Sequence, residues 1–172
     1  MAVQFDYVAP KGWKPKNPDE DYIITLIKVE LDESAVNEAK KKGASEKELF
    51  RDAAGTVAAE SSTGTWTKVY DGKDSGIPLA RAKRAMAYDL DYERKMFKVA
   101  YPLDLFEMNN ISGLLAGIVG NIAGMKMVSA MRVYDVRFPK KMISAFPGPA
   151  FGVPGVRKIL KKPKQCLVCT VP

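Results

Sequence analysis

Histidine is missing from the sequence, and cysteine occurs only twice, at Cys166 and Cys169. The lack of histidine excludes Ser-His-Asp and Cys-His catalysis within this chain, as well as any histidine-bound metal. It also removes the usual general base near neutral pH. Two cysteines form no disulfide framework, which indicates a reducing, cytoplasmic setting. Their C-x-x-C spacing supplies at most half of a zinc site, so we expect no metal site in this chain.

Long apolar runs are also missing. The longest candidate, residues 111–127, stays below the roughly 20 residues that cross a bilayer, and it is interrupted by Gly113, Gly117, Gly120 and Gly124. The first six residues lack the basic and apolar regions of a secretory signal. We therefore expect no membrane partner. The length of 172 residues predicts one domain, or one domain with a short extension.

Basic side chains outnumber acidic ones, with 27 Lys and Arg against 20 Asp and Glu and a net charge of +7. Such an excess suits an anionic partner, for example a nucleic acid or a phosphorylated substrate, and equally a solvated surface. The basic residues are spread along the chain, with denser patches at 40–42, 140–141 and 157–164. This spread favours a solvated surface, and nucleic acid is not the expected partner.

The first part of the chain predicts a strand and then a helix. Residues 22–31 are rich in β-branched side chains and predict a strand in the centre of a sheet. Residues 32–44 are polar and predict a loop or a solvated helical turn. Ser45 and Glu48 then form a capping-box pattern, which begins a predicted helix over residues 46–59. Apolar side chains recur along this helix at helical spacing: Phe50, Ala53, Ala54, Val57 and Ala58.

The second part predicts further strands and one more helix. Apolar and polar residues alternate before a turn at 91–95, which is typical of a hairpin. An apolar helix is predicted over residues 110–124 and ends at Gly124. Strands are predicted at residues 65–70, 86–92, 96–101 and 128–138. The order of the main elements is the ferredoxin-like βαββαβ pattern of the α+β class, which predicts a mixed sheet with two helices on one face.

The two ends of the chain differ from this pattern. Residues 10–21 are rich in Pro, Lys and Asp and predict an irregular segment. Residues 146–155 are rich in Pro and Gly, a short helix is predicted over 156–161, and 166–171 has the composition of a strand without a partner. That last strand is expected to be the first element of a second, missing domain. The chain is thus predicted to have three parts. Residues 1–20 form an irregular N-terminal segment, residues 21–140 a ferredoxin-like domain, and residues 141–172 a linker with a short helix and a strand.

A polar turn after the first predicted helix carries the main candidate site. Glu60 lies at the C-terminal end of that helix, where a carboxylate opposes the helix dipole. The hydroxyls and glycine of residues 61–65 can approach a phosphate closely, and a plain polar turn is the simpler alternative. Trp66 either stacks on a ligand or packs in the core. Asn121 carries an amide within an apolar helix. That amide is either presented to a ligand or bonded to a loop.

Several motifs resemble the large subunit of ribulose-bisphosphate carboxylase (Rubisco), over residues 15–172. Residues 58–66 are similar to the family's A-x-E-S-S-T-G-T-W segment. Residues 101–107 are similar to the family's Y-P-x-x-x-F-E stretch, and residues 113–126 to a helix that ends in G-N-x-x-G-M-K. The F-P at 138–139 and the G-P-x-x-G at 148–152 are similar to the link into the barrel. The G-N-I-x-G-M-K form resembles the archaeal type III enzymes.

The resemblance implies a carboxylase and a role for four residues. In this family the N-terminal domain covers the mouth of the partner subunit's barrel, in a homodimer or a higher oligomer of dimers. Ribulose 1,5-bisphosphate and CO2 react there to give 3-phosphoglycerate, with Mg²⁺ bound by the barrel. Glu60 corresponds to the carboxylate that pairs with a mobile barrel-loop lysine, and Asn121 to an amide near the metal and the substrate oxygens. Thr65 and Trp66 correspond to a phosphate site.

The chain departs from the family at its end. The family's (β/α)8 barrel begins with a strand ending in K-P-K, and this sequence stops at Pro172, where the first lysine is expected. The carbamylated lysine, the acidic metal ligands and the mobile loop belong to the barrel, so the chain alone is expected to be inactive. Two alternatives stay open. One is a stand-alone ferredoxin-like module that binds nucleic acid or protein, and the other is the N-terminal domain of a Rubisco-like enolase or isomerase.

Overall fold

The computed structural model describes residues 6–63, 84–106, 111–119, 125–145, 152–159 and 161. Its strands are β1 (Tyr22–Leu31), β2 (Met86–Asp91), β3 (Met96–Pro102) and β4 (Val128–Arg137). Its helices are α1 (Pro18–Asp21), α2 (Glu33–Lys41), α3 (Glu46–Thr63), α5 (Ile111–Val119), α6 (Lys140–Ala145) and α7 (Gly152–Ile159), with a 3-10 turn, η2, at Leu103–Leu105. The strands predicted at 65–70 and 166–171 lie outside the described residues.

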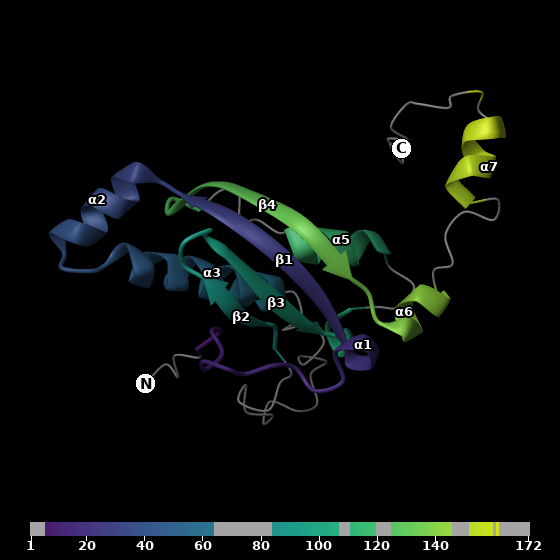
Figure 1. Cartoon of the computed structure of the whole chain (residues 1–172), viewed down its shortest axis with the longest axis horizontal. Coiled ribbons are helices and arrows are strands. Elements are labelled where there is room, and N and C mark those ends of the chain that lie inside the picture. The colour runs from purple at the N-terminus through teal and green to yellow at the C-terminus, as the bar shows by residue number, and fades with distance from the viewer. Residues whose placement is uncertain are drawn as a thin grey trace, which may run out of the picture.

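Four strands form one sheet in the order β2-β3-β1-β4, with β1 in the centre as predicted (Figure 1). This order, with a helix after β1 and another after β3, confirms the α+β, ferredoxin-like βαββαβ fold. The expected mixed sheet is wrong for these strands, because all three ladders are antiparallel. β3 follows β2 through a hairpin and inserts beside β1, so it runs against both neighbours. Within the described residues, parallel pairing is limited to one bridge between Val8 and Ala87.

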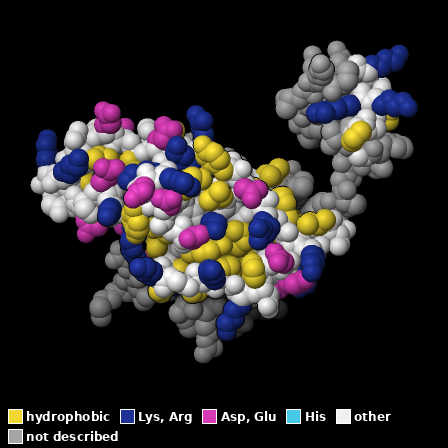
Figure 2. Space-filling view, in the orientation of Figure 1, with side chains coloured by type: hydrophobic (Ala, Val, Ile, Leu, Met, Phe, Trp, Pro, Cys, Tyr) yellow, Lys and Arg dark blue, Asp and Glu magenta, His cyan; other side chains and the backbone are white. Residues whose placement is uncertain are grey.

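The two faces of the sheet differ in what covers them. Along β1, Ile23, Thr25, Ile27 and Val29 are buried, whereas the residues between them are partly exposed. Because side chains alternate along a strand, the buried ones share one face and pack against α3 and α5. Both helices lie behind the strands in Figure 1, which confirms the prediction of two helices on one face. Figure 2 shows the opposite face, where hydrophobic side chains gather over the strands and charged side chains surround them.

Helix α3 begins at the predicted capping box. The Ser45 hydroxyl accepts the backbone N–H of Glu48 at 3.2 Å, and the Glu48 carboxylate accepts the backbone N–H of Ser45 at 2.6 Å. The predicted apolar side chains of this helix are fully buried: Phe50, Ala53, Ala54, Val57 and Ala58. The helix continues to Thr63 rather than to residue 59, so part of the expected polar turn is helical.

The hairpin between β2 and β3 has the predicted turn. The Asp91 carboxylate accepts the backbone N–H groups of Glu93 and Arg94, both at 3.0 Å. Lys95 has a positive φ of 55° and closes the turn. Its ammonium lies 2.9 Å from the carboxylate of Glu46, which joins the hairpin to the first turn of α3.

Helix α5 follows β3 and is predominantly apolar. Leu114 and Ile118 are buried against the sheet, whereas Leu115 is 49% exposed. The described part of this helix ends at Val119, so the predicted stop at Gly124 lies outside the described residues.

Two helices were not predicted, a third was predicted only as a helical turn or a loop, and a fourth is displaced. The polar segment after β1 forms α2, because the Asp32 carboxylate caps it by accepting the Ala35 backbone N–H at 3.1 Å. The irregular segment before β1 ends in α1, and α6 begins directly after β4. Helix α7 covers residues 152–159 instead of 156–161.

Ion pairs join α1 to the end of β4 and to α6, which lie side by side in Figure 1. Their nitrogen–oxygen distances are 3.9, 3.4 and 3.5 Å for Arg137 with Asp19, Lys140 with Glu20 and Lys141 with Asp21. All these side chains are well exposed to solvent.

The Thr25 hydroxyl is buried in the core without a hydrogen bond. Thr25 is fully buried in β1, and its Oγ1 has no hydrogen-bond partner. We expect Thr25→Val, which keeps the side-chain shape, to raise the free energy of unfolding by about 1 kcal/mol, because a desolvated hydroxyl is removed. Urea unfolding of the two chains measures the difference.

The matched control for this change is Thr56→Val. The Thr56 hydroxyl donates to the backbone carbonyl of Asp52 at 2.7 Å, so its removal should bring no gain. An unchanged or lower stability of Thr25→Val would contradict the assignment of an unsatisfied hydroxyl.

Candidate functional site

Glu60 is the one predicted site residue that lies within the described part of the chain. It occupies the last turns of α3, three residues before Thr63, and its side chain is exposed. Because the carbonyl end of a helix carries partial negative charge, a carboxylate there is not favoured by the helix itself.

The other predicted site residues, Thr65, Trp66 and Asn121, lie outside the described residues. Thr65 and Trp66 follow α3 by two and three residues, and Asn121 follows the described end of α5 by two. Helices α3 and α5 contact each other on one face of the sheet, so Glu60 lies on a helix of that face.

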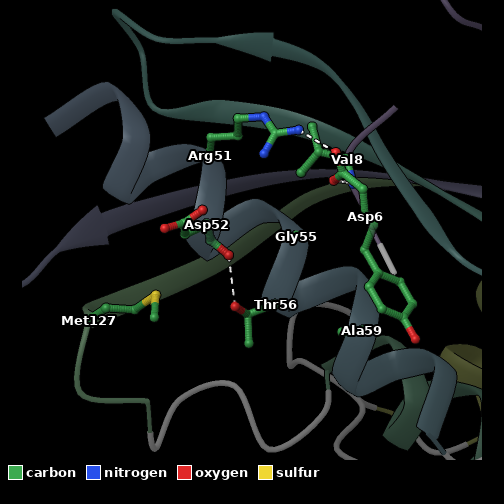
Figure 3. Close-up of a pocket in the computed structure, with 9 residues that line it drawn as sticks. Asp6, Val8, Arg51, Asp52, Gly55, Thr56, Ala59 and Met127 are labelled. Carbon is green, nitrogen blue, oxygen red and sulfur yellow. Dashed lines mark hydrogen bonds and ion pairs between the residues drawn. The ribbon is translucent and has the colours of Figure 1, made fainter. Parts of the chain in front are cut away.

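A surface cavity of about 620 Å³ lies along α3, between Arg51 and Ala59 (Figure 3). It is lined by Asp6, Tyr7, Val8, Arg51, Asp52, Gly55, Thr56, Ala59 and Met127. Arg51 Nη2 lies 2.6 Å from Asp6 Oδ2, and the Thr56 hydroxyl is bonded to its own helix. The polar groups of Arg51 and Thr56 therefore already bond to protein atoms. The cavity lies where α3 packs against the N-terminal segment.

A second cavity of about 460 Å³ lies between α2, the start of α3 and Met125–Met127. Its charged groups are an exposed cluster, in which the Glu38 carboxylate lies 2.8 Å from Lys42 and 3.7 Å from Lys126. The hydrogen bond from Lys42, followed by the charges of Lys42 and Lys126, lowers the pKa of Glu38. This arrangement is typical of a solvated surface network.

Hydrogen bonds and nearby cations lower the pKa of several carboxyl groups in the described residues. The pKa of Asp6 is lowered chiefly by the backbone N–H of Val8, with a further contribution from Arg51, and Lys95 lowers the pKa of Glu46. Hydrogen bonds in helix caps and turns likewise lower the pKa of Asp32, Glu48 and Asp91. A general acid at neutral pH needs a raised carboxyl pKa, so these groups are suited to holding structure rather than to transferring protons.

Metal binding and membrane insertion find no support in the described ranges. Within them, no group of three or more His, Cys, Asp or Glu side chains could hold a metal ion. No helix there is both long and apolar enough to cross a bilayer.

Sequence patterns missed the residues that fasten the N-terminal segment to α3. Arg51 was not singled out, and its partner Asp6 is 45 residues away. One local signal was present, namely Gly55 in the middle of an apolar helical pattern. Such a glycine often marks a close approach of another segment.

The described residues thus form an α+β domain with two helices on one sheet face, and Glu60 lies in the last turns of one of these helices. Residues 33–142 match the family described as "Ribulose bisphosphate carboxylase large chain, N-terminal domain". The chain belongs to this family.

Individual relatives agree with the family match. The ribulose bisphosphate carboxylase of Thermococcus kodakarensis is 39% identical over 170 residues, which cover 98% of this chain and 35% of that protein. The dimeric archaeal Rubisco of Hyperthermus butylicus is 36% identical, with a TM-score of 0.61 over 89% of this chain and 32% of that one. The octameric Rubisco of Pyrococcus horikoshii is 30% identical, with a TM-score of 0.62 over 91% and 32%. The chain thus spans about a third of the length of these relatives.

Proposed function

We propose that this chain is the N-terminal part of a ribulose bisphosphate carboxylase and supplies residues to a site completed by a partner subunit's barrel. The reaction is carboxylation of ribulose 1,5-bisphosphate by CO2 to give 3-phosphoglycerate. The observation that carries the proposal is the 39% identity to a carboxylase over nearly the whole chain. The proposed domain boundaries are residues 21–140, followed by the linker and the first barrel strand at 141–172.

Four residues are proposed to act in the shared site. The exposed carboxylate of Glu60 pairs with a lysine from the partner's mobile barrel loop and orients its charge toward the reacting centre. The Asn121 amide donates to substrate oxygens, and Thr65 and Trp66 hold one phosphate through hydroxyl and N–H donors. All four residue types of the family motif are present in the sequence.

Magnesium is proposed to be held by the barrel and not by this chain. The described residues supply no cluster of metal ligands, so they do not fit Mg²⁺, and no step of this proposal passes through the metal in this domain. The work of this domain is to orient and enclose the substrate.

A second large subunit is the proposed partner. The H. butylicus and P. horikoshii relatives are dimeric and octameric, which supports a homodimer or an oligomer of dimers. On this chain, the half-exposed Leu115 on the predominantly apolar α5 suits burial against another protein surface. A cytoplasmic location is proposed from the low cysteine content.

The test of this function joins the chain to a barrel. The isolated chain should show no carboxylation of ribulose 1,5-bisphosphate, since the barrel's lysines and metal ligands are needed for catalysis. A chimera in which this chain replaces the matching N-terminal third of the T. kodakarensis carboxylase should fix ¹⁴CO2 into 3-phosphoglycerate.

Two results would count against the proposal. Robust activity of the isolated chain would show that the barrel is not required. A chimera that folds and dimerises but is no more active than the T. kodakarensis barrel alone would contradict the role of this domain. Salt-sensitive RNA binding by the isolated chain, measured by filter retention, would favour the stand-alone binding module instead.

A further inference from the structure

The N-terminal residues Asp6–Ala9 lie between the sheet and α3. On the sheet side, the Ala87 backbone N–H donates to the Tyr7 carbonyl and the Ala9 N–H donates to the Ala87 carbonyl, both at 2.8 Å. These bonds form the parallel bridge and extend the sheet beyond β2. The Arg84 guanidinium lies 5.5 Å from the centre of the Tyr7 ring and adds a contact at this edge.

Asp6 and Val8 of this segment also contact α3 (Figure 3). Arg51 donates from Nη2 to Asp6 Oδ2 at 2.6 Å, and the backbone N–H of Val8 donates to the other Asp6 oxygen at 2.9 Å. The Val8 side chain is 7% exposed and lies against Gly55. A Cβ at Gly55 would be 3.2 Å from Val8 Cγ2, closer than ordinary contact.

Gly55 allows Val8 of the N-terminal segment to pack closely against α3. A glycine in the interior of an 18-residue helix is less stable than alanine, because its backbone loses more freedom on folding. At Gly55 the missing side chain leaves room for Val8. Gly55 therefore lowers the local stability of α3 at the place where the N-terminal segment crosses the helix.

The position of α3 matters because Glu60 lies on it. The hairpin fastens the first turn through Lys95 and Glu46, and the N-terminal segment fastens the middle through Arg51 and Gly55. Glu60 follows Arg51 by nine residues, which is about 13.5 Å along the helix axis at 1.5 Å per residue. A small rotation of α3 in its middle would therefore move the Glu60 carboxylate.

We propose that residues Asp6–Ala9 form a strap that fixes α3 against the sheet, and that Arg51 and Gly55 are positioning residues for Glu60. The first half of this proposal concerns the fold of this chain alone. The second half rests on the proposed carboxylase function.

Hydrogen exchange in the whole chain tests the strap. Asp6→Arg and Arg51→Asp should each speed exchange of the amides of residues 57–60 by about two- to fivefold, as expected for a half-exposed ion pair, and the double variant should restore it. Lys98→Ala is the matched control, because Lys98 and Asp89 lie 2.7 Å apart with exposed fractions of 40% and 62%, against 42% and 59% for Arg51 and Asp6. Unchanged exchange in the single variants, or an equal rise at Ile27 and Val99, would overturn the strap.

A double-mutant cycle in the chimera tests positioning of Glu60. Arg51→Ala should lower kcat about two- to fivefold per assembled dimer with KM for ribulose 1,5-bisphosphate unchanged, and Arg51→Lys should recover most of it. In the Glu60→Gln variant, Arg51→Ala should have no further effect. Equal losses with and without Glu60→Gln would overturn positioning through Glu60. Failure of the carboxylase proposal would appear separately, as an inactive wild-type chimera with the exchange results intact.

Discussion

In the chimera with the T. kodakarensis barrel, we expect Glu60→Gln to lower kcat by about 100-fold or more, the usual effect of removing one preorganised electrostatic contact to a transition state. The substitution keeps the shape of the side chain and removes its charge, so the pairing with a barrel-loop lysine is lost. KM for ribulose 1,5-bisphosphate should change little, because the phosphate contacts are elsewhere. Steady-state carboxylation with purified dimers gives both constants.

The control for this substitution is Glu93→Gln at the tip of the β2–β3 hairpin. Glu93 is also an exposed glutamate, and the structure gives its side chain no part in the candidate site. Its variant should retain full activity. A Glu60→Gln chimera with wild-type kcat would refute the role of Glu60 while leaving the family membership of the chain intact.

The largest effect on stability is expected from Phe50→Ala in α3. Phe50 is fully buried, and its ring lies edge-to-face with Tyr92 at 5.5 Å and Phe97 at 5.9 Å. Its removal leaves a cavity between the helix and the hairpin and should cost about 3–5 kcal/mol. That loss is comparable to the whole stability of a small domain, about 5–15 kcal/mol, so much of the protein should be unfolded at 37 °C.

Urea unfolding with circular dichroism measures the effect of Phe50→Ala. Leu115→Ala provides the comparison, because Leu115 is 49% exposed and its loss should cost well under half as much. A cost below about 1 kcal/mol for Phe50→Ala would show that the aromatic cluster is not a main support of α3.

Local patterns in the sequence were sufficient for most of the fold. The capping box at Ser45 and Glu48, the apolar spacing after it and the turn at Asp91 depend on neighbouring residues, and each is present in the structure. The direction of strand pairing was predicted less well, since the sheet order depends on contacts between distant segments. The α2 cap by Asp32 was overlooked because a Lys-rich segment with little apolar periodicity gives a weak helical signal.

The candidate site was less accessible to pattern analysis. Local patterns gave only a weak signal for Glu60, Trp66 and Asn121, and the roles of these residues and of Thr65 came from the resemblance to a family. Arg51 and Asp6 show the limit clearly, because an ion pair across 45 residues leaves no local pattern. Gly55 was the available signal, since a glycine within an apolar helix has a cost that some contact must offset.

The ion pairs between α1 and the segment after β4 have a consequence for behaviour in salt. These charges are exposed, so mobile ions screen them over about 10 Å at 0.1 M ionic strength, whereas the buried contacts of the sheet are indifferent to such ions. Because Met142 holds α6 in the hydrophobic core, added salt should weaken the pairs with α1 without releasing α6 from the sheet.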